Sequence, residues 1–310
     1  MKRVFFRYSF IALAAVFISG VISGLFYLSS KISALENGGL SSYIYNLLGQ
    51  DAHKKEEKPA AAPEFTIQIP EGWTNRDIGQ YFSRLGKWTS EDLYEAVGQT
   101  SYDVCGGKRQ TDRDWKKEYS FLADKPDCAS LEGYLFPDTY RLYASSTVEE
   151  AVSRMLDNFD KKLDDSLRKE IKLQGKTIND VIIMASLIEK EAPISYSDKE
   201  NLAARMISGI FWRRLKNGQR LESDATLSYI LEDKKDQHSG EELDNSSPYN
   251  TYRKAGLPPG PICNPGLVAI EAAIYPIRSD YNFFLTDQNG NVYYARTYEE
   301  HLRNKYKYLR

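Results

Sequence analysis

The feature that most constrains this chain is an uncharged, mainly apolar run at residues 8–30, which follows a short cationic tail. Coiled into an α-helix at about 1.5 Å per residue, the run would be about 35 Å long, enough to cross a hydrocarbon core of about 30 Å. A cleaved signal peptide is the alternative, but its apolar region is usually about 7–15 residues long and ends at a small-residue site, which residues 28–30 match poorly. The sequence therefore predicts a tail and a single transmembrane anchor over residues 1–30.

The cations Lys2, Arg3 and Arg7 precede this run and predict its orientation. Because cationic flanks favour the cytoplasmic side, everything after residue 30 is expected on the outer, periplasmic or extracytoplasmic face of the cell membrane. Residues 31–63 carry mixed charges and prolines with little apolar periodicity, which predicts a stalk or linker. A short interfacial helix over residues 43–48 is the alternative for part of this stretch.

The content of charged residues, histidines and cysteines narrows the classes of function that are open to the chain. Lys and Arg number 41 against 43 Asp and Glu, a formal net charge of -2, so the chain has no basic excess for nucleic acid. Three histidines and three cysteines favour neither a metal site nor a disulfide scaffold, and we expect no metal and no cofactor. In an oxidising compartment Cys105 and Cys128 could form one disulfide, with two free thiols as the alternative, and Cys263 would be left over.

Residues 64–146 have the pattern of a small α+β domain. Alternating apolar and polar residues at 65–69 predict a strand, and Thr74 opens a helix that ends near Gly86. A second helix is expected near 91–97, and the stretch 131–142 supplies a second strand. The cysteine-bearing insertion between them is interpreted as a surface loop or excursion.

Residues 147–310 predict a mainly helical α+β domain. Apolar spacings of three and four follow Thr147, an almost wholly apolar helix starts at Thr177 and ends before Pro193, and further helices are expected after a capping box at 197–200 and over 225–231. An Asn-Gly turn between 281–285 and 292–295 predicts a C-terminal hairpin.

Two carboxylates at the end of the apolar helix are the strongest chemical signal. Glu189 shares a stripe with Ile182 and Ala185, whereas Glu191 lies on another stripe of the same helix. If such a stripe packs inward, desolvation raises the pKa of the carboxyl group and makes it a general acid near neutral pH. Solvated acids at a helix end are the alternative, and periodicity alone does not choose between Glu189 and Glu191.

Two other clusters come later in the chain. Ser223 or Asp224 either caps the next helix or belongs to a site, and the loop at 249–266 combines Pro and Gly with aromatic and amide side chains suited to binding a sugar. A purely structural turn is the alternative for this loop.

Together these segments resemble the YceG-like family, the membrane-anchored endolytic murein transglycosylases. The resemblance extends from residue 65 to the end of the chain. The matching motifs, in family order, are LEGYLFPDTY at 131–140, ASLIEKE at 185–191, SDAT at 223–226, YNTY at 249–252, GLPPG at 256–260 and NPG at 264–266.

The resemblance implies a LysM-like domain at 64–146 and a catalytic domain at 147–310. It implies endolytic cleavage of peptidoglycan glycan strands, with work beside peptidoglycan synthases, and it selects Glu189 as the catalytic acid. It further implies that a group of motif residues lines the cleft: Asp224, Thr226, Tyr249, Asn250 and Asn264.

Such an enzyme needs one acid, because the C6 hydroxyl of the muramoyl sugar attacks its own anomeric carbon. Glu189 would first donate and then accept a proton, leaving a 1,6-anhydromuramoyl end. Two alternatives stay open at this point: a hydrolase in which Asp224 or Glu191 activates water, and a tethered wall-binding scaffold without activity.

Overall fold

The computed structural model describes residues 24–25, 27–29, 62–99, 111, 113–195, 200–233, 235, 238 and 240–309. The chain divides into Met1–Ala62 and Pro63–Arg310, and the folded elements described below belong to the second unit. Most of the predicted anchor and stalk lies outside the described residues. Within the described residues, none of the helices has the length and apolar character needed to cross a membrane.

The first elements of the folded unit form the predicted α+β arrangement. Strand β1 (Glu64–Gln68) pairs antiparallel with β2 (Thr139–Tyr143), and helices α3 (Asn75–Arg84) and α4 (Ser90–Val97) lie between them in sequence. The strands alternate buried and exposed residues, as the sequence predicted. Both helices begin with a Thr-x-x-Asp capping box, which satisfies amides that would otherwise lack a partner.

The insertion between α4 and β2 is more than the surface loop that the sequence predicted. Its described part contains α5 (Trp115–Glu118) and the short helix η3 (Ser120–Leu122). Trp115 is buried and donates its indole N–H to the Ala96 carbonyl oxygen at 2.8 Å, and buried Phe121 stacks on Phe159 with ring centroids 4.6 Å apart. Of the two predicted alternatives, a surface loop does not describe this part, because its aromatic side chains belong to the core.

The structure describes two of the three cysteines, Cys128 and Cys263. Cys128 is disulfide-bonded, and Cys263 is free and buried. Cys105, the predicted partner of Cys128, lies outside the described residues, so the pairing stays a prediction.

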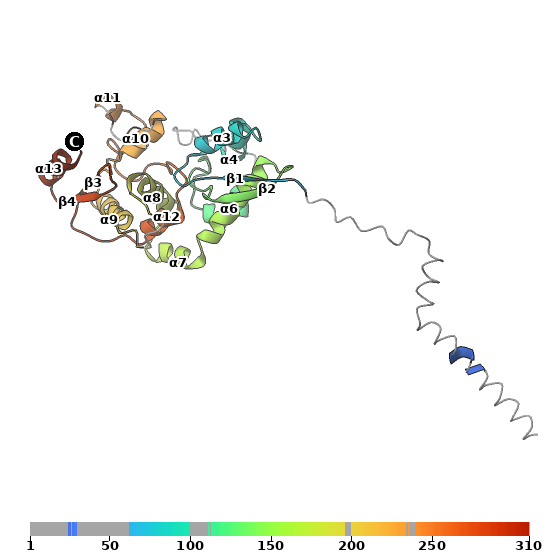
Figure 1. Cartoon of the computed structure of the whole chain (residues 1–310). Helices are drawn as coiled ribbons and strands as arrows, with labels where there is room; N and C mark the ends of the chain where they lie inside the picture. The colour runs from blue at the N-terminus through green and yellow to red at the C-terminus, as the bar shows by residue number, and fades with distance from the viewer. Residues whose placement is uncertain are drawn as a thin grey trace, which may run out of the picture. The chain divides into compact units, whose positions relative to one another are not determined.

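The rest of the unit is mainly helical, with α8 at its centre (Figure 1). The side chains of α8 from Val181 to Ile188 are all buried, and α7, α9, α10 and α12 each pack against this helix. Its burial on all sides explains why its sequence is apolar all round. The helices are α6 (Val148–Lys162), α7 (Asp165–Leu173), α8 (Ile178–Glu191), α9 (Leu202–Lys216), α10 (Asp224–Leu231), α11 (Gly240–Leu243) and α12 (Leu267–Ile274).

Helix α9 starts later than predicted. Residues 197–199 of the expected capping box lie outside the described residues, and the helix begins at Leu202. Asn201 is its N-cap, in a left-handed conformation with φ of 42° and no capping bond from its side chain. Asn tolerates this conformation better than most residues.

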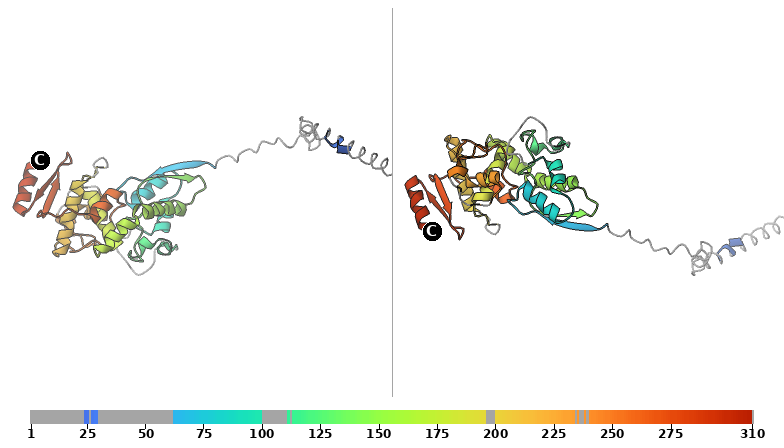
Figure 2. Two further views of the ribbon diagram at one scale, coloured as in Figure 1. Left: turned by 90° about the horizontal axis from the view of Figure 1, so that it is seen from below. Right: turned by 90° about the horizontal axis from the view of Figure 1, so that it is seen from above.

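The chain ends in the predicted hairpin, covered by a further helix. Strands β3 (Phe283–Thr286) and β4 (Val292–Ala295) pair antiparallel, and α13 (Tyr298–Tyr308) packs on both. Tyr308 stacks on Tyr293 at 3.6 Å between ring centroids. The two sheets lie at opposite ends of the folded unit (Figure 2).

One hydrophobic core extends through both predicted domains. It includes Ile67 and Phe82 from the first and Met184 and Ile270 from the second. Pro63–Arg310 is accordingly one compact unit. The proposed boundary at 146/147 and the LysM-like relationship of 64–146 stay predictions, and residues 64–146 are called the small region from here on.

Candidate active site

Glu189 lies in the last turn of α8, where its carboxyl group meets the start of another helix. The Gly266 N–H donates a hydrogen bond to Glu189 Oε2 at 3.0 Å, and Gly266 is the N-cap of α12. The partial positive charge at a helix N-terminus favours the ionised carboxylate. The structure thus brings together two residues 77 positions apart.

Two groups of effects act on the protonation of Glu189. Burial raises the pKa of its carboxyl group to about 7, although the hydrogen bond from the Gly266 N–H lowers this pKa. The charge of Glu71 raises this pKa further, and that of Lys190 lowers it. A carboxyl group with a pKa near neutrality exists in both forms at physiological pH, so Glu189 can donate and accept a proton.

A turn from the small region covers one side of Glu189. A methyl group added to Gly72 would lie 3.5 Å from Glu189 Cγ and 3.7 Å from Lys190 Nζ. Gly72 has a positive φ of 75°, which suits glycine, and its neighbour Glu71 is exposed. Residues 70–73, the 70–73 turn, therefore lie directly beside the acid.

Glu191, the other acid of the pair, has a structural role. Ser223 Oγ donates a hydrogen bond to Glu191 Oε1 at 2.5 Å, and the Ala225 N–H donates another to the same carboxyl group. Since Ser223 is the N-cap of α10, Glu191 supplies a cap that the Ser223 side chain does not provide. Burial raises the pKa of Glu191 as well. The two acids of the motif thus meet the N-termini of two different helices.

Two of the predicted cleft residues, Thr226 and Asn250, are fully buried. Thr226 Oγ1 donates to the Ser223 carbonyl oxygen at 2.8 Å. Asn250 Nδ2 donates to the carbonyl oxygens of Leu243 and Asn245 at 2.9 and 2.7 Å. Both are interior residues whose polar atoms are bonded within the protein, and their contact with substrate stays a prediction.

Tyr249 and Asn264 are interior residues too. Tyr249 is 5% exposed and packs against Tyr229, with ring centroids 5.4 Å apart. Asn264 is fully buried, and its Oδ1 accepts a hydrogen bond from the Leu135 N–H at 2.9 Å. The contact of these two residues with substrate stays a prediction as well. Asp224, at the start of α10, is partly exposed and hydrogen-bonds Tyr252, so its contact with substrate stays a prediction.

Sequence reasoning missed Glu132, although it lies in the quoted LEGY motif. Its side chain is buried, and burial raises its pKa to about 8. The Asn75 N–H donates to both carboxyl oxygens at 3.0 and 3.2 Å, and the Tyr229 hydroxyl lies 3.3 Å from Oε2. An acid among the mainly apolar residues 131–136 was the available signal. Gly266 lies in the quoted NPG motif, but neither this motif nor the turn at Gly72 indicated contact with Glu189, because that contact joins residues distant in sequence.

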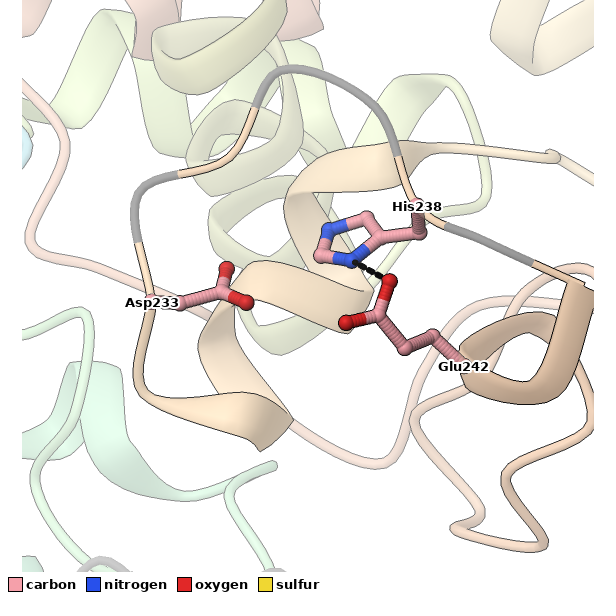
Figure 3. A group of neighbouring side chains, drawn as sticks. All are labelled: Asp233, His238 and Glu242. Atoms are coloured by element: carbon pink, nitrogen blue, oxygen red, sulfur yellow. Dashed lines mark ion pairs between the residues drawn. The ribbon is translucent and has the colours of Figure 1, made fainter.

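A second polar cluster lies away from these residues in sequence. The ligand atoms of Asp233, His238 and Glu242 lie within 4.8 Å of one another, an arrangement that could hold a metal ion (Figure 3). The Lys235 ammonium group already forms ion pairs with Glu242 and, at 3.5 Å, with Asp233 Oδ2. A positive charge is thus supplied by the chain itself, and we assign no metal to this cluster.

Sequence comparison finds relatives that are named endolytic murein transglycosylases. It is 36% identical over 179 residues to an endolytic murein transglycosylase of Bacillus subtilis (strain 168), a match that covers 58% of this chain and 48% of that protein. It is 38% identical over 251 residues to an endolytic murein transglycosylase of Streptococcus pneumoniae serotype 2, covering 77% of this chain and 44% of that protein. The chain therefore spans less than half the length of these curated relatives.

A solved structure is also similar to this chain. The crystal structure of a yceG-like protein from Listeria monocytogenes matches with a TM-score of 0.64 and 32% identity, over 77% of this chain and 75% of that one. The sequence model of the YceG-like family matches residues 27–307, which include Glu189, Gly266 and the 70–73 turn. Since this match covers nearly all of the sequence, the chain belongs to the YceG-like family.

Proposed function

We propose that this protein is a membrane-anchored endolytic lytic transglycosylase. It cleaves the bond from N-acetylmuramic acid to N-acetylglucosamine in peptidoglycan glycan strands, with Glu189 as general acid and then general base. The observation that carries the proposal is the partly buried Glu189 carboxyl group, whose pKa is raised to about 7 beside the α12 N-terminus. The names of the B. subtilis and S. pneumoniae relatives support the same activity.

The reaction is balanced by one proton that leaves Glu189 and one that returns. Protonated Glu189 donates to the glycosidic oxygen as the bond from that oxygen to the anomeric carbon breaks, and the bonding electrons stay on the oxygen. The C6 hydroxyl of the same muramoyl sugar then bonds to the anomeric carbon and gives its proton to Glu189. The products are a 1,6-anhydromuramoyl end and a free N-acetylglucosamine hydroxyl, and no water is consumed.

Opposing effects on Glu189 suit the two halves of this reaction. Burial favours the neutral acid that must donate first, whereas the Gly266 N–H and the α12 N-terminus favour the carboxylate that forms next. Neither form is strongly disfavoured at neutral pH. A single residue can therefore serve in turn as acid and base.

The proposed cellular setting rests on the sequence. The apolar run at 8–30 would hold the protein in the cell membrane, with residues 63–310 on the outer face close to newly made glycan strands. Peptidoglycan synthases are the proposed neighbours, because the family resemblance suggests action on nascent strands.

The test uses the full chain in detergent and purified glycan strands. We expect Glu189→Gln to reduce cleavage by about 100-fold or more, because a positioned general acid contributes roughly that much. Glu191→Gln is the matched control: it removes a charge two residues away, keeps an acceptor for Ser223, and should retain most activity.

Mass spectrometry of the released fragments identifies the reaction. Anhydro ends support the proposal, whereas ends heavier by one water would replace it with the hydrolase alternative. Binding of glycan strands without cleavage by the wild-type chain would favour the scaffold alternative instead.

A further inference from the structure

We propose that the 70–73 turn of the small region is part of the active site: Gly72 positions the catalytic acid, Glu71 places a negative charge beside it, and Asn264 fixes the turn there. This inference rests on the proposed role of Glu189 and extends the active site to a region outside the predicted catalytic domain at 147–310. Gly72 and Asn264 are positioning residues in this proposal, since they act through Glu189.

The first support is the close approach at Gly72. A methyl group added at Gly72 would lie 3.5 Å from Glu189 Cγ, an ordinary van der Waals distance. The turn therefore packs against the side chain of the acid. Gly72 is itself buried. With Gly72 on one side and the Gly266 N–H bonded to the carboxyl group, the acid is held between two backbone segments.

The second support is that one asparagine ties both segments together. The main chain of Asn264 accepts from the Gly72 N–H at 2.9 Å and donates to the Trp73 carbonyl oxygen at 2.8 Å. Its Nδ2 also lies 3.0 Å from the Trp73 carbonyl oxygen. Gly266 comes two residues later, so Asn264 fixes the spacing between the two backbone segments that contact Glu189.

Further bonds anchor this arrangement in the interior. Asn264 Nδ2 lies 3.2 Å from Asn75 Oδ1 and 3.4 Å from Glu132 Oε1, and Glu132 in turn accepts from the Asn75 N–H. Asn75 is the first residue of α3, directly after the turn. The side chains of Asn264, Asn75 and Glu132 are all buried, so water does not compete for these hydrogen bonds. The bonds therefore hold the turn in a fixed geometry.

Two charged side chains of the described residues act on the pKa of Glu189: Glu71 from the turn and Lys190 from α8. The Cys263 thiol, in the loop before α12, also interacts with Glu189, but burial raises its pKa well above the usual value, so it stays neutral. Glu71 is exposed, and its negative charge opposes ionisation of Glu189. The same charge would also attract the positive charge that develops at the anomeric carbon.

The first experiment compares two glycine variants of the full chain. Gly72→Ala and Gly86→Ala both place alanine at a positive φ in the small region, 75° and 64°, where a side chain strains the backbone and shifts it. A methyl group added at Gly72 would lie in ordinary van der Waals contact with the acid, 3.5 Å from Glu189 Cγ, whereas one added at Gly86 would have no atom within 4 Å. Because only the shift at Gly72 reaches the acid, we expect kcat/KM for glycan cleavage to fall about tenfold or more in Gly72→Ala and to change less than about twofold in Gly86→Ala. Equal losses in the two variants, with both folded, would overturn the positioning role.

The second experiment tests Glu71 by the titration of Glu189. In Glu71→Gln the alkaline limb of the pH–rate profile should move to lower pH, because loss of the negative charge makes Glu189 easier to ionise. Glu71→Asp keeps the charge and should keep the limb. The shift should shrink at high ionic strength, since Glu71 is exposed. An unchanged limb in Glu71→Gln at low salt would overturn the role of this charge.

A readout without substrate separates this inference from the proposed function. Carbon-13 NMR of labelled Glu, with Glu189 assigned from the Glu189→Gln spectrum, reports the pKa of Glu189 directly. A shift of that pKa in Glu71→Gln and Gly72→Ala, but not in Gly86→Ala, supports the inference even if glycan cleavage were to fail. An unaltered pKa in both turn variants would contradict it even if cleavage is confirmed.

Discussion

At the residue scale, the site depends on carboxyl groups that the fold removes from water. Glu189 and Glu132 both have their pKa raised by burial, to about 7 and about 8, but their surroundings differ. Glu189 is partly exposed at a helix end, whereas Glu132 is enclosed and accepts hydrogen bonds from Asn75 and Tyr229. Exposure and a small number of bonds suit a reacting group, and enclosure suits a structural one.

The raised pKa of Glu132 predicts a pH dependence of stability. The folded protein holds this proton up to a higher pH than the unfolded chain, whose Glu titrates near 4.5, so the free energy of unfolding falls as pH rises from about 4.5 to about 8. Glu132→Gln cannot lose a proton, and its unfolding free energy should fall less over that window. Urea unfolding at a series of pH values measures both slopes. Parallel slopes for wild type and variant would show that Glu132 does not carry the effect.

At the element scale, α8 was the helix best predicted from sequence. The helix was expected to start at Thr177, which caps it in a capping box with Asp180, and it ends two residues before Pro193. Helix α12 was not predicted, because Leu267–Ile274 is short and apolar around nearly its whole circumference and so has no helical stripe. Yet α12 supplies the Gly266 N–H to Glu189. The family resemblance selected Glu189 as the acid, but no pattern in the sequence indicated that the Gly266 N–H would bond to it.

The cap that Glu191 provides to α10 predicts a measurable stability effect. Glu191→Ala should lower the free energy of unfolding by about 1–2 kcal/mol, because the Ser223 hydroxyl and the Ala225 N–H lose their acceptor. Glu191→Gln keeps an acceptor oxygen and should lose less. Urea unfolding of the two variants beside wild type tests this, and an alanine variant as stable as wild type would argue against the cap.

At the scale of the whole molecule, the α+β class, the pairing of the first and second strands with helices between them, and the final hairpin were predictable from local patterns. The contacts between the small region and the rest were not, since they join residues far apart in sequence: Asn264 and Leu135 are separated by 129 positions. The same distance explains why the burial of Thr226, Tyr249, Asn250 and Asn264 could not be predicted. A motif indicates which residues matter but not whether they face substrate or support the residues that do.

The shared core predicts that residues 63–310 unfold as one unit. Ile67 and Phe82 belong to the same core as Met184 and Ile270, so neither predicted domain should be stable after the other unfolds. Differential scanning calorimetry of the full chain in detergent should show a single transition for this unit, with matching calorimetric and van't Hoff enthalpies. Two separated transitions, the first confined to residues 64–146, would contradict this expectation.

The pairing of Asn264 with Gly72 and Trp73 also has a consequence for how such proteins can be recombined. A chimera joined at residue 146 would take the 70–73 turn from one parent and the Asn-Pro-Gly loop from the other. Because these two pieces are joined by hydrogen bonds, exchanging one alone would change the position of the Glu189 carboxyl group even where both parents are folded. A functional chimera should therefore take the 70–73 turn and the Asn-Pro-Gly loop from the same parent.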